Sequence, residues 1–252
     1  MLAVLTAAVS LLLVPGAYAA TQDGAVVTLH AKTHTSKSKT VCVDWAPTVP
    51  CSQYATTWPL GVNADVYLVV ARALEAPGIA GLSCGIMYDG VAPSGIDVFG
   101  WYLCADLEFT NAGAFGEWPE AGGGNRITWS MIDACQRTVI GTDGVHAIAG
   151  AFYIYAYGPD VLQVTPNNNL QSEPELAVAD CTASTTYLPV DGSAAGSVGF
   201  GQPGCNPCAE NCGPPPIATT PTTWGKVKAV LTADDMRTIW KLARRSSLRK
   251  VG

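Results

Sequence analysis

The stretch "ADVYLVVARAL", residues 64 to 74, decides the fold. Its residues are apolar without a break from Val66 to Ala71, so a strand formed here is apolar on both of its faces. Such a strand is typical of the centre of a sheet, where both faces are covered. We therefore expect residues 64 to 74 to form a central strand.

The segments on either side of it alternate between apolar and polar residues with a period of two, the pattern of strands with one buried face. In "GAVVTLHAK", residues 24 to 32, Val27 and Leu29 share one face, and Thr28 and His30 share the other. Further strands are expected at residues 80–90, 95–104, 125–132, 145–160, 160–166, 174–181 and 185–190. About nine short strands, with no convincing helix before residue 224, predict an all-β protein with an antiparallel β-sandwich of immunoglobulin-like or jelly-roll type.

Three segments carry a resemblance to a known family: "VYLVV" at residues 66–70, "GIAGLSCGIMYDG" at 78–90 and "DGVHAIAGAFYIYAYGPDVLQV" at 143–164. Over residues 24 to 190 the chain resembles the cohesin and related immunoglobulin-like sandwich modules of secreted bacterial proteins, in which an early strand ends in a Tyr-Asp turn. It is also similar to Cys-containing secreted bacterial proteins, some of which end in a tail like "TTWGKVKAVL", residues 222–231. The resemblance implies a cohesin-like sandwich, secretion and a modular protein, and it implies no activity.

The first twenty residues predict export. They hold an uncharged run from Leu2 to Val14, a Pro15-Gly16 break, and Ala17 and Ala19 at the spacing that a signal peptidase reads. The alternative interpretation is a buried N-terminal strand or helix. No later stretch offers the roughly 20 apolar residues of a spanning helix, so we expect a soluble mature chain without a transmembrane segment.

Charge and composition divide the chain into parts. Residues 21 to 223 hold 18 acidic and 6 basic residues, a net charge of −12, whereas residues 224 to 252 hold 2 acidic and 8 basic residues, a net charge of +6. We expect a signal peptide at 1–19, a β-sandwich domain at 20–203, a Cys loop and Pro/Thr-rich linker at 204–223, and a tail at 224–252. Nucleic acid is excluded as a partner of the acidic body, because affinity for phosphate rests on Lys and Arg.

The tail reads as a short basic amphipathic helix. Thr232 and Asp235 have the spacing of a capping box, and Met236, Ile239 and Trp240 follow at helical spacing. Its basic residues Arg244, Arg245, Arg249 and Lys250 are candidates for peripheral contact with an anionic surface. The alternative is a solvated end without such a role.

Nine cysteines in an exported chain predict disulfides, with one thiol left over because the number is odd. They are Cys42, Cys51, Cys84, Cys104, Cys135, Cys181, Cys205, Cys208 and Cys212. We expect a local Cys42–Cys51 pair, and we consider Cys84–Cys104 and Cys135–Cys181, although the sequence leaves the swaps open. The loop "GCNPCAENCG", residues 204 to 213, holds three of the nine cysteines. A zinc site would need a further pair of ligands, and a redox site would need a βαβ setting. We therefore expect Cys205 or Cys208 to form a disulfide within the loop or to the body, with one of the three thiols left over.

Several motifs have the residues of catalytic or cofactor-binding sites but lack the secondary structure that such sites require. "GLSCG", residues 81 to 85, has the letters of a nucleophile elbow, with Asp133 or Asp143 and then His146 in hydrolase order, but Ser83 lies in a strand that no helix follows. "GFGQPG", residues 199 to 204, matches a dinucleotide fingerprint but reads as a flexible loop. The carboxylate pairs Asp106–Glu108 and Glu117–Glu120 have the residue types for glycoside hydrolysis, although solvated loop charges explain them more simply.

No metal or cofactor is expected, because His30 and His34 would share a face only if their strand continued, and His146 stands alone. The aromatic residues Trp101, Trp129, Tyr153, Tyr155 and Tyr157 would form a sugar- or peptide-binding platform on an open strand face, or they pack in the core. We therefore expect a secreted or surface-associated, non-catalytic module for binding, adhesion or structural assembly, with a protein or glycan ligand at the cell envelope. The alternative is a secreted hydrolase built on Ser83 or on paired carboxylates.

Overall fold

The computed structural model describes residues 21–34, 40–43, 46–89, 94–111, 116–168 and 174–213. These residues form strands and one short 3₁₀ helix, and no α-helix lies within the described ranges. The elements are β1 (Val26–Thr33), η1 (Cys51–Gln53), β2 (Thr57–Trp58), β3 (Ala64–Ala73), β4 (Gly81–Met87), β5 (Ile96–Leu103), β6 (Leu107–Asn111), β7 (Gly124–Thr128), β8 (Val145–Ala156), β9 (Asp160–Thr165), β10 (Ala177–Ala179), β11 (Thr185–Tyr187) and β12 (Ser197–Phe200).

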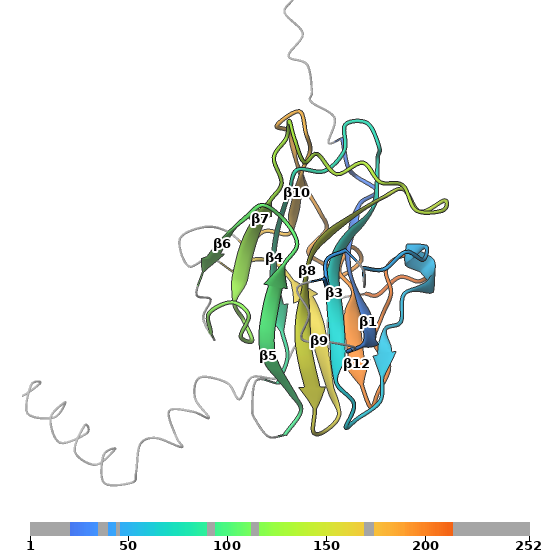
Figure 1. Cartoon of the computed structure of the whole chain (residues 1–252), viewed down its shortest axis with the longest axis vertical. Helices are drawn as coiled ribbons and strands as arrows, with labels where there is room; N and C mark the ends of the chain where they lie inside the picture. Colours follow the sequence, from blue (N-terminus) through green and yellow to red (C-terminus); the bar gives the residue numbers. More distant parts are fainter. Residues whose placement is uncertain are drawn as a thin grey trace, which may run out of the picture. The chain divides into compact units, whose positions relative to one another are not determined.

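The strands form two sheets (Figure 1). One sheet has the order β1-β3-β8-β5. The other has the order β11-β10-β4-β9-β12-β2, and β7 pairs with β4 on one side and with β6 on the other. All neighbours are antiparallel except β12 and β2, which run parallel. The prediction of an all-β sandwich is confirmed, whereas the signal peptide and the basic tail lie outside the described residues.

The central strand predicted at residues 64–74 is β3, which pairs with β1 on one side and β8 on the other. Nearly all of it is buried, and the exception is Arg72. Leu68 lies in the shared core with Phe152 of β8 and Leu162 of β9. Tyr67 is buried too, and its hydroxyl donates to the backbone oxygen of Val41. Burial on both faces explains why this stretch is apolar throughout.

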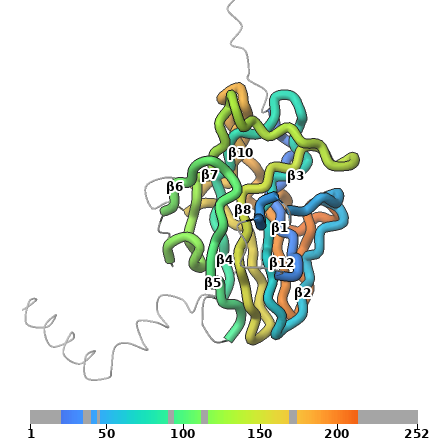
Figure 2. Tube along the Cα trace, in the orientation of Figure 1, coloured from blue at the N-terminus to red at the C-terminus, as the bar shows by residue number. Residues whose placement is uncertain are grey.

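One long side of the sandwich is closed by backbone hydrogen bonds. The N–H of Val27 in β1 donates to Ala194, and the N–H of Gly196 donates back to Val27. The chain at Ala55 and Thr56 links β1 to β12, since Ala31 donates to Ala55 and Gly199 donates to Thr56. Figure 2 shows β1, β2 and β12 together on this side. On the other side, β5 ends its sheet and β6 pairs with β7 alone among the described strands.

Three strands were not predicted: β2, β6 and β12. The most consequential is β12, because "GFGQPG" was expected to be a flexible loop, yet its first two residues, Gly199 and Phe200, end a strand that is buried throughout. Gly199 and Gly204 are needed there for close packing, since a Cβ atom on Gly199 would overlap Gln202 and one on Gly204 would overlap Thr56. Glycine in this segment therefore indicates close approach of two chain segments rather than flexibility.

The predicted Cys42–Cys51 pair is wrong. Cys42 bonds to Cys104, and Cys51 bonds to Cys208. The two cysteines instead tie their segment to β5 on one side and to the C-terminal loop on the other. The Cys84–Cys104 pair is also wrong, because Cys84 lies in β4 with its side chain in the core.

The Cys135–Cys181 pair is confirmed. The loop "GCNPCAENCG" holds two disulfides, Cys205–Cys212 within the loop and Cys51–Cys208 to the body. None of its three thiols is left over, so that part of the prediction is wrong. The free thiol is Cys84, and complete burial raises its pKa to about 12.

Candidate functional site

The strand registers place one row of side chains across five strands, on the face of the sheet that points away from the core. Residues directly opposite each other in an antiparallel pair point to the same face. Ser83 of β4 lies opposite Ala177 of β10 and Arg126 of β7, Ala177 lies opposite Tyr187 of β11, and Arg126 lies opposite Phe109 of β6. The row therefore reads Phe109, Arg126, Ser83, Ala177, Tyr187.

A second row runs parallel to the first. It contains Leu107, Thr128, Gly81, Ala179 and Thr185. Its middle members are small, as Ser83 and Ala177 are in the first row. The members of the two rows on β7, β4, β10 and β11 line a shallow hollow of about 300 Å³, which we call the trough. Tyr187, which is 70 % exposed, lines one end of the trough, and Phe109, which is 59 % exposed, ends the first row on β6, next to Arg126.

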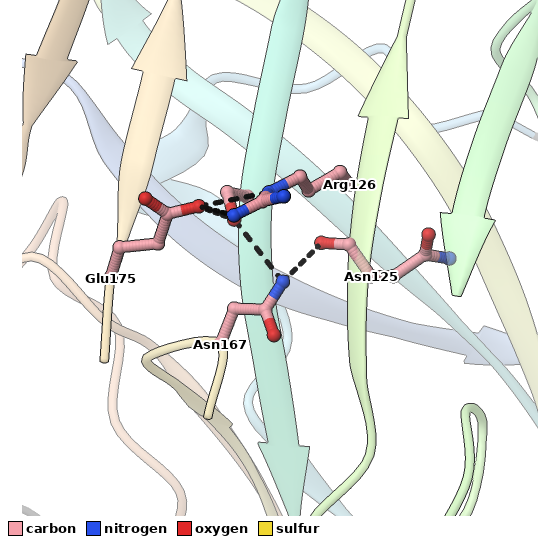
Figure 3. Close-up of polar contacts among 5 residues, drawn as sticks. Asn125, Arg126, Asn167 and Glu175 are labelled. Atoms are coloured by element: carbon pink, nitrogen blue, oxygen red, sulfur yellow. Dashed lines mark hydrogen bonds and ion pairs between the residues drawn. The ribbon is translucent and has the colours of Figure 1, made fainter. Parts of the chain in front are cut away.

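The middle of the trough holds a hydrogen-bonded polar cluster (Figure 3). The hydroxyl of Ser83 donates to Oε1 of Glu175 at 2.8 Å, and Nδ2 of Asn167 donates to the Ser83 hydroxyl at 3.2 Å. Arg126 donates from Nε to the same carboxylate oxygen at 3.0 Å, and one of its terminal nitrogens lies 2.9 Å from it. Because Arg126 compensates Glu175, the cluster presents hydrogen-bonding groups without a net charge.

The geometry does not support the alternative of a hydrolase built on Ser83 with His146. Ser83 lies in β4, whereas His146 lies in β8 of the other sheet. Nδ1 of His146 is 2.9 Å from the hydroxyl of Tyr54, and its Nε2 atom is buried without a hydrogen-bond partner. A serine nucleophile needs a histidine nitrogen within hydrogen-bond reach. Where a histidine would be needed, the Ser83 hydroxyl instead donates to the carboxylate of Glu175, which is already paired with Arg126.

The two acidic candidates serve loops. Oδ2 of Asp143 accepts hydrogen bonds from the backbone N–H and the hydroxyl of Ser52. The backbone N–H of Asp133 donates to the hydroxyl of Ser130 within its own turn. Neither arrangement orients His146 toward a serine.

His30 and His34 do not form a shared site. Nδ1 of His30 accepts a hydrogen bond from the N–H of Ala55, and the ring stacks on Tyr54. His34 lies past the end of β1, where its Nδ1 is 2.9 Å from Oδ1 of Asp65. Burial, reinforced by the charge of Lys32, lowers the pKa of His30 to about 4. Burial also lowers the pKa of His146.

Only one member of each carboxylate pair of the sequence lines a common groove. Oδ2 of Asp106 accepts a hydrogen bond from the N–H of Ser130. Glu108 lies on the face of β6 opposite to Leu107 and Phe109, and its Oε2 atom accepts from Trp101 and Asn125. Members of two different pairs, Glu108 and Glu120, line one open groove of about 440 Å³ between β5 and β6. Spacing in the sequence therefore did not indicate that Glu108 and Glu120 share a surface.

The predicted aromatic platform is not one surface. Trp129 is buried, and Trp101 packs edge-on against Trp118 and tilted against Phe152. Tyr153 stacks on His34, while Tyr155 meets Tyr157 at its edge. Trp129 and Trp101 thus contribute to packing, and the tyrosines lie on β8 and just beyond it.

Sequence reasoning missed three residues of the trough, Arg126, Glu175 and Tyr187, and Phe109 at the end of the first row. The available signal was the alternation of Leu107 and Phe109 with Glu108 and Thr110. That pattern has period two, but its apolar residues face solvent, so it did not read as a strand with a buried apolar face.

Within the described ranges, no three His, Cys, Asp or Glu side chains lie close enough together to hold a metal ion. The same residues include no helix of the length and hydropathy that a membrane crossing requires. The candidate docking residues of the tail, Arg244, Arg245, Arg249 and Lys250, lie outside the described part of the chain.

No protein-family model matches this chain, and no curated protein matches it. Among solved structures, it is similar to a cohesin module from a Clostridium perfringens ATCC13124 family 33 glycoside hydrolase. The identity is 10 %, the TM-score is 0.37, and the match covers 69 % of this chain and 96 % of that one. The resemblance to cohesin modules stated from the sequence is therefore confirmed as a weak structural likeness.

Proposed function

We propose that the body is a non-catalytic binding module of an exported protein, and that the trough binds a neutral glycan chain. The observation that carries the proposal is the pair of rows across β6, β7, β4, β10 and β11, with small residues in the middle and exposed aromatic rings at both ends. Four disulfides are consistent with an extracellular protein.

The length of the first row suits an extended oligomer. Neighbouring strands lie about 4.8 Å apart, so four strand spacings separate Phe109 from Tyr187 by about 19 Å. Aromatic rings present flat apolar surfaces on which the C–H faces of a sugar ring can pack. A chain of several sugar units can therefore reach from one ring to the other.

The chemistry between the rings favours a neutral ligand. Ser83, Thr128 and Thr185 offer hydroxyl groups, and Arg126 with Glu175 offers donors and acceptors whose charges compensate each other. A charged ligand would have to break this ion pair, whereas sugar hydroxyls can bond to it as it stands. The Ser83 hydroxyl donates to Glu175, and because Glu175 is paired with Arg126 it is a poor general base. This arrangement supports binding rather than hydrolysis.

Affinity electrophoresis tests the proposal. Native gels that contain a soluble neutral polysaccharide, either hydroxyethylcellulose, xylan or laminarin, should retard the wild-type protein in at least one case. Phe109→Ala and Tyr187→Ala should abolish or strongly reduce the retardation, because loss of one stacking ring commonly costs about 1–3 kcal/mol of binding.

Phe99→Ala is the matched control, because Phe99 is similarly exposed but lies in β5 of the other sheet. It should leave the retardation unchanged. Equal retardation of the wild type and both trough variants would contradict the proposal, and so would hydrolysis of the polysaccharide that Ser83→Ala removes.

A further inference from the structure

The edge of β5 is a second surface that the proposed function does not use. β5 pairs with β8 along one side, and no described strand pairs with its other side. Within the described ranges, residues 98 to 101 make no backbone hydrogen bond outside the pairing with β8. An unpaired strand edge of this kind presents N–H and C=O groups that can pair with another extended chain, on either side of the bulge at Phe99.

A groove follows this edge. Its walls are residues 98–101 of β5, Glu108 and Thr110 of β6, and residues 118–120, and its volume is about 440 Å³. Successive residues of a strand point to opposite faces. The register of β5 with β8 shifts between Val98 and Gly100, so a bulge at Phe99 interrupts this alternation and neighbouring residues of β5 can line the same groove.

The groove has uncompensated acidic groups. Glu108 and Glu120 line it, and no Lys or Arg does. Among the described residues the two ion pairs are His34–Asp65 and Arg126–Glu175, so neither groove carboxylate has a cationic partner there. Oε2 of Glu108 accepts from Nε1 of Trp101 at 2.9 Å and from Nδ2 of Asn125 at 2.7 Å, and both donors are neutral.

Aromatic rings complete the walls. Phe99 is 53 % exposed, and Trp101, two residues further along β5, donates from its indole to Glu108. A guanidinium group can stack on such rings and bond to a carboxylate at the same time, which makes arginine the side chain that best matches this combination. Gly100 has no side chain to block the approach, and a Cβ atom there would have no neighbour within 4 Å.

We propose that this edge groove binds an extended, arginine-containing segment of a partner protein, which adds to β5 as a further strand. The backbone of the segment pairs with residues 98–101, and its arginine side chains meet Glu108 and Glu120. Strand addition gives affinity through main-chain hydrogen bonds, while alternate side chains give specificity. The uncompensated charge and the free backbone edge distinguish this groove from the trough, where both charges are paired.

The test uses the full-length protein and a fluorescein-labelled hexapeptide, Arg-Thr-Arg-Thr-Arg-Thr, with binding measured by fluorescence anisotropy. The wild type should bind the peptide. Glu120→Gln and Gly100→Trp should each weaken binding by about tenfold or more, the first by removing a charge and the second by filling open space at the groove. The same peptide with every second backbone nitrogen methylated should bind about tenfold more weakly, because it cannot donate along one edge.

Glu117→Gln is the matched control, since Glu117 is exposed, lies close in sequence and does not line the groove. It removes the same charge from the body and should leave the affinity unchanged. If circular dichroism shows that Gly100→Trp does not fold, the test rests on comparing the peptide affinities of Glu120→Gln and Glu117→Gln. Absence of peptide binding, equal loss in both glutamate variants, equal binding of the methylated peptide, or displacement of the peptide by xylohexaose would each overturn the proposal.

Discussion

The imidazole of His30 is held in its neutral form by its surroundings. Its Nδ1 atom accepts from the N–H of Ala55, so protonation of that nitrogen would remove an acceptor from a buried donor. Burial and then the charge of Lys32 lower the pKa of the ring to about 4. The sequence could place His30 in a strand, but this state depends on Tyr54 and Ala55, which reach the ring only in the folded chain.

The shifted pKa makes stability depend on pH. Above about pH 6.5, His30 is neutral in the folded and unfolded chains and has no effect. Between about pH 6.5 and about pH 4 the unfolded chain binds a proton that the folded chain does not, so the free energy of unfolding falls as the pH falls. At about pH 5 this loss amounts to about 2 kcal/mol. His30→Gln, which does not titrate, should lose about 2 kcal/mol less than the wild type between about pH 7 and about pH 5 in urea denaturation. An identical loss in both proteins would refute the assignment.

At the scale of elements, the strands that could be predicted from the sequence were those with long buried apolar runs. β3, β4 and β8 have long apolar runs, and the sequence indicated all three because a buried strand needs apolar side chains. β6 escaped because its charged Glu108 faces inward while Leu107 and Phe109 face solvent. β12 was not predicted because Gly199 is there to allow close approach of another chain segment, and the sequence does not show which segment that is.

Gly199 and Gly100 give opposite outcomes for the same substitution. Gly199→Ala should destabilise the protein by about 2–4 kcal/mol, because its Cβ atom would overlap the backbone of Gln202 and Pro203. Gly100→Ala should change stability by less than about 1 kcal/mol, because its Cβ atom meets open space. The midpoints of urea unfolding measure both. Similar stabilities of the two variants would show that β12 does not pack as described.

At the scale of the whole molecule, the disulfides connect segments that are far apart in the sequence. Cys51 and Cys208 are 157 residues apart, and Cys42 and Cys104 are 62 residues apart. The sequence predicted export and pairing, but the local Cys42–Cys51 pair failed because the fold carries each cysteine to a different neighbour. Spacing in the sequence says little about connectivity when strands bring distant segments together.

The thiol count follows from this connectivity. Four disulfides use eight of the nine cysteines, so the denatured, unreduced protein should take up one alkylating group, at Cys84. The native protein should take up none, because the thiol is buried and burial raises its pKa to about 12. Peptide mapping by mass spectrometry measures the site. Label at a second cysteine, or a Cys42–Cys51 peptide pair, would contradict the pairing.

The basic tail remains a proposal about the chain as a whole. Its +6 charge against the −12 of residues 21–223 suggests that it contacts an anionic surface, where each cationic residue contributes on the order of 1 kcal/mol. The full-length protein should co-sediment with phosphatidylglycerol vesicles at low salt and less at high salt, since salt screens exposed charges. Replacement of Arg244, Arg245, Arg249 and Lys250 by Gln should abolish co-sedimentation, and unchanged co-sedimentation would exclude the tail as the anchor.

The central claim is that the trough is a binding surface and not a catalytic site. Titration of the ¹⁵N-labelled protein with the oligosaccharide of whichever polysaccharide retards it, followed by amide chemical shifts, tests this claim most directly. The account predicts shifts concentrated at residues 81–83, 107–109, 126–128 and 177–187, with the oligosaccharide recovered intact. Shifts confined to the β1-β3-β8-β5 sheet, or cleavage of the oligosaccharide, would contradict it.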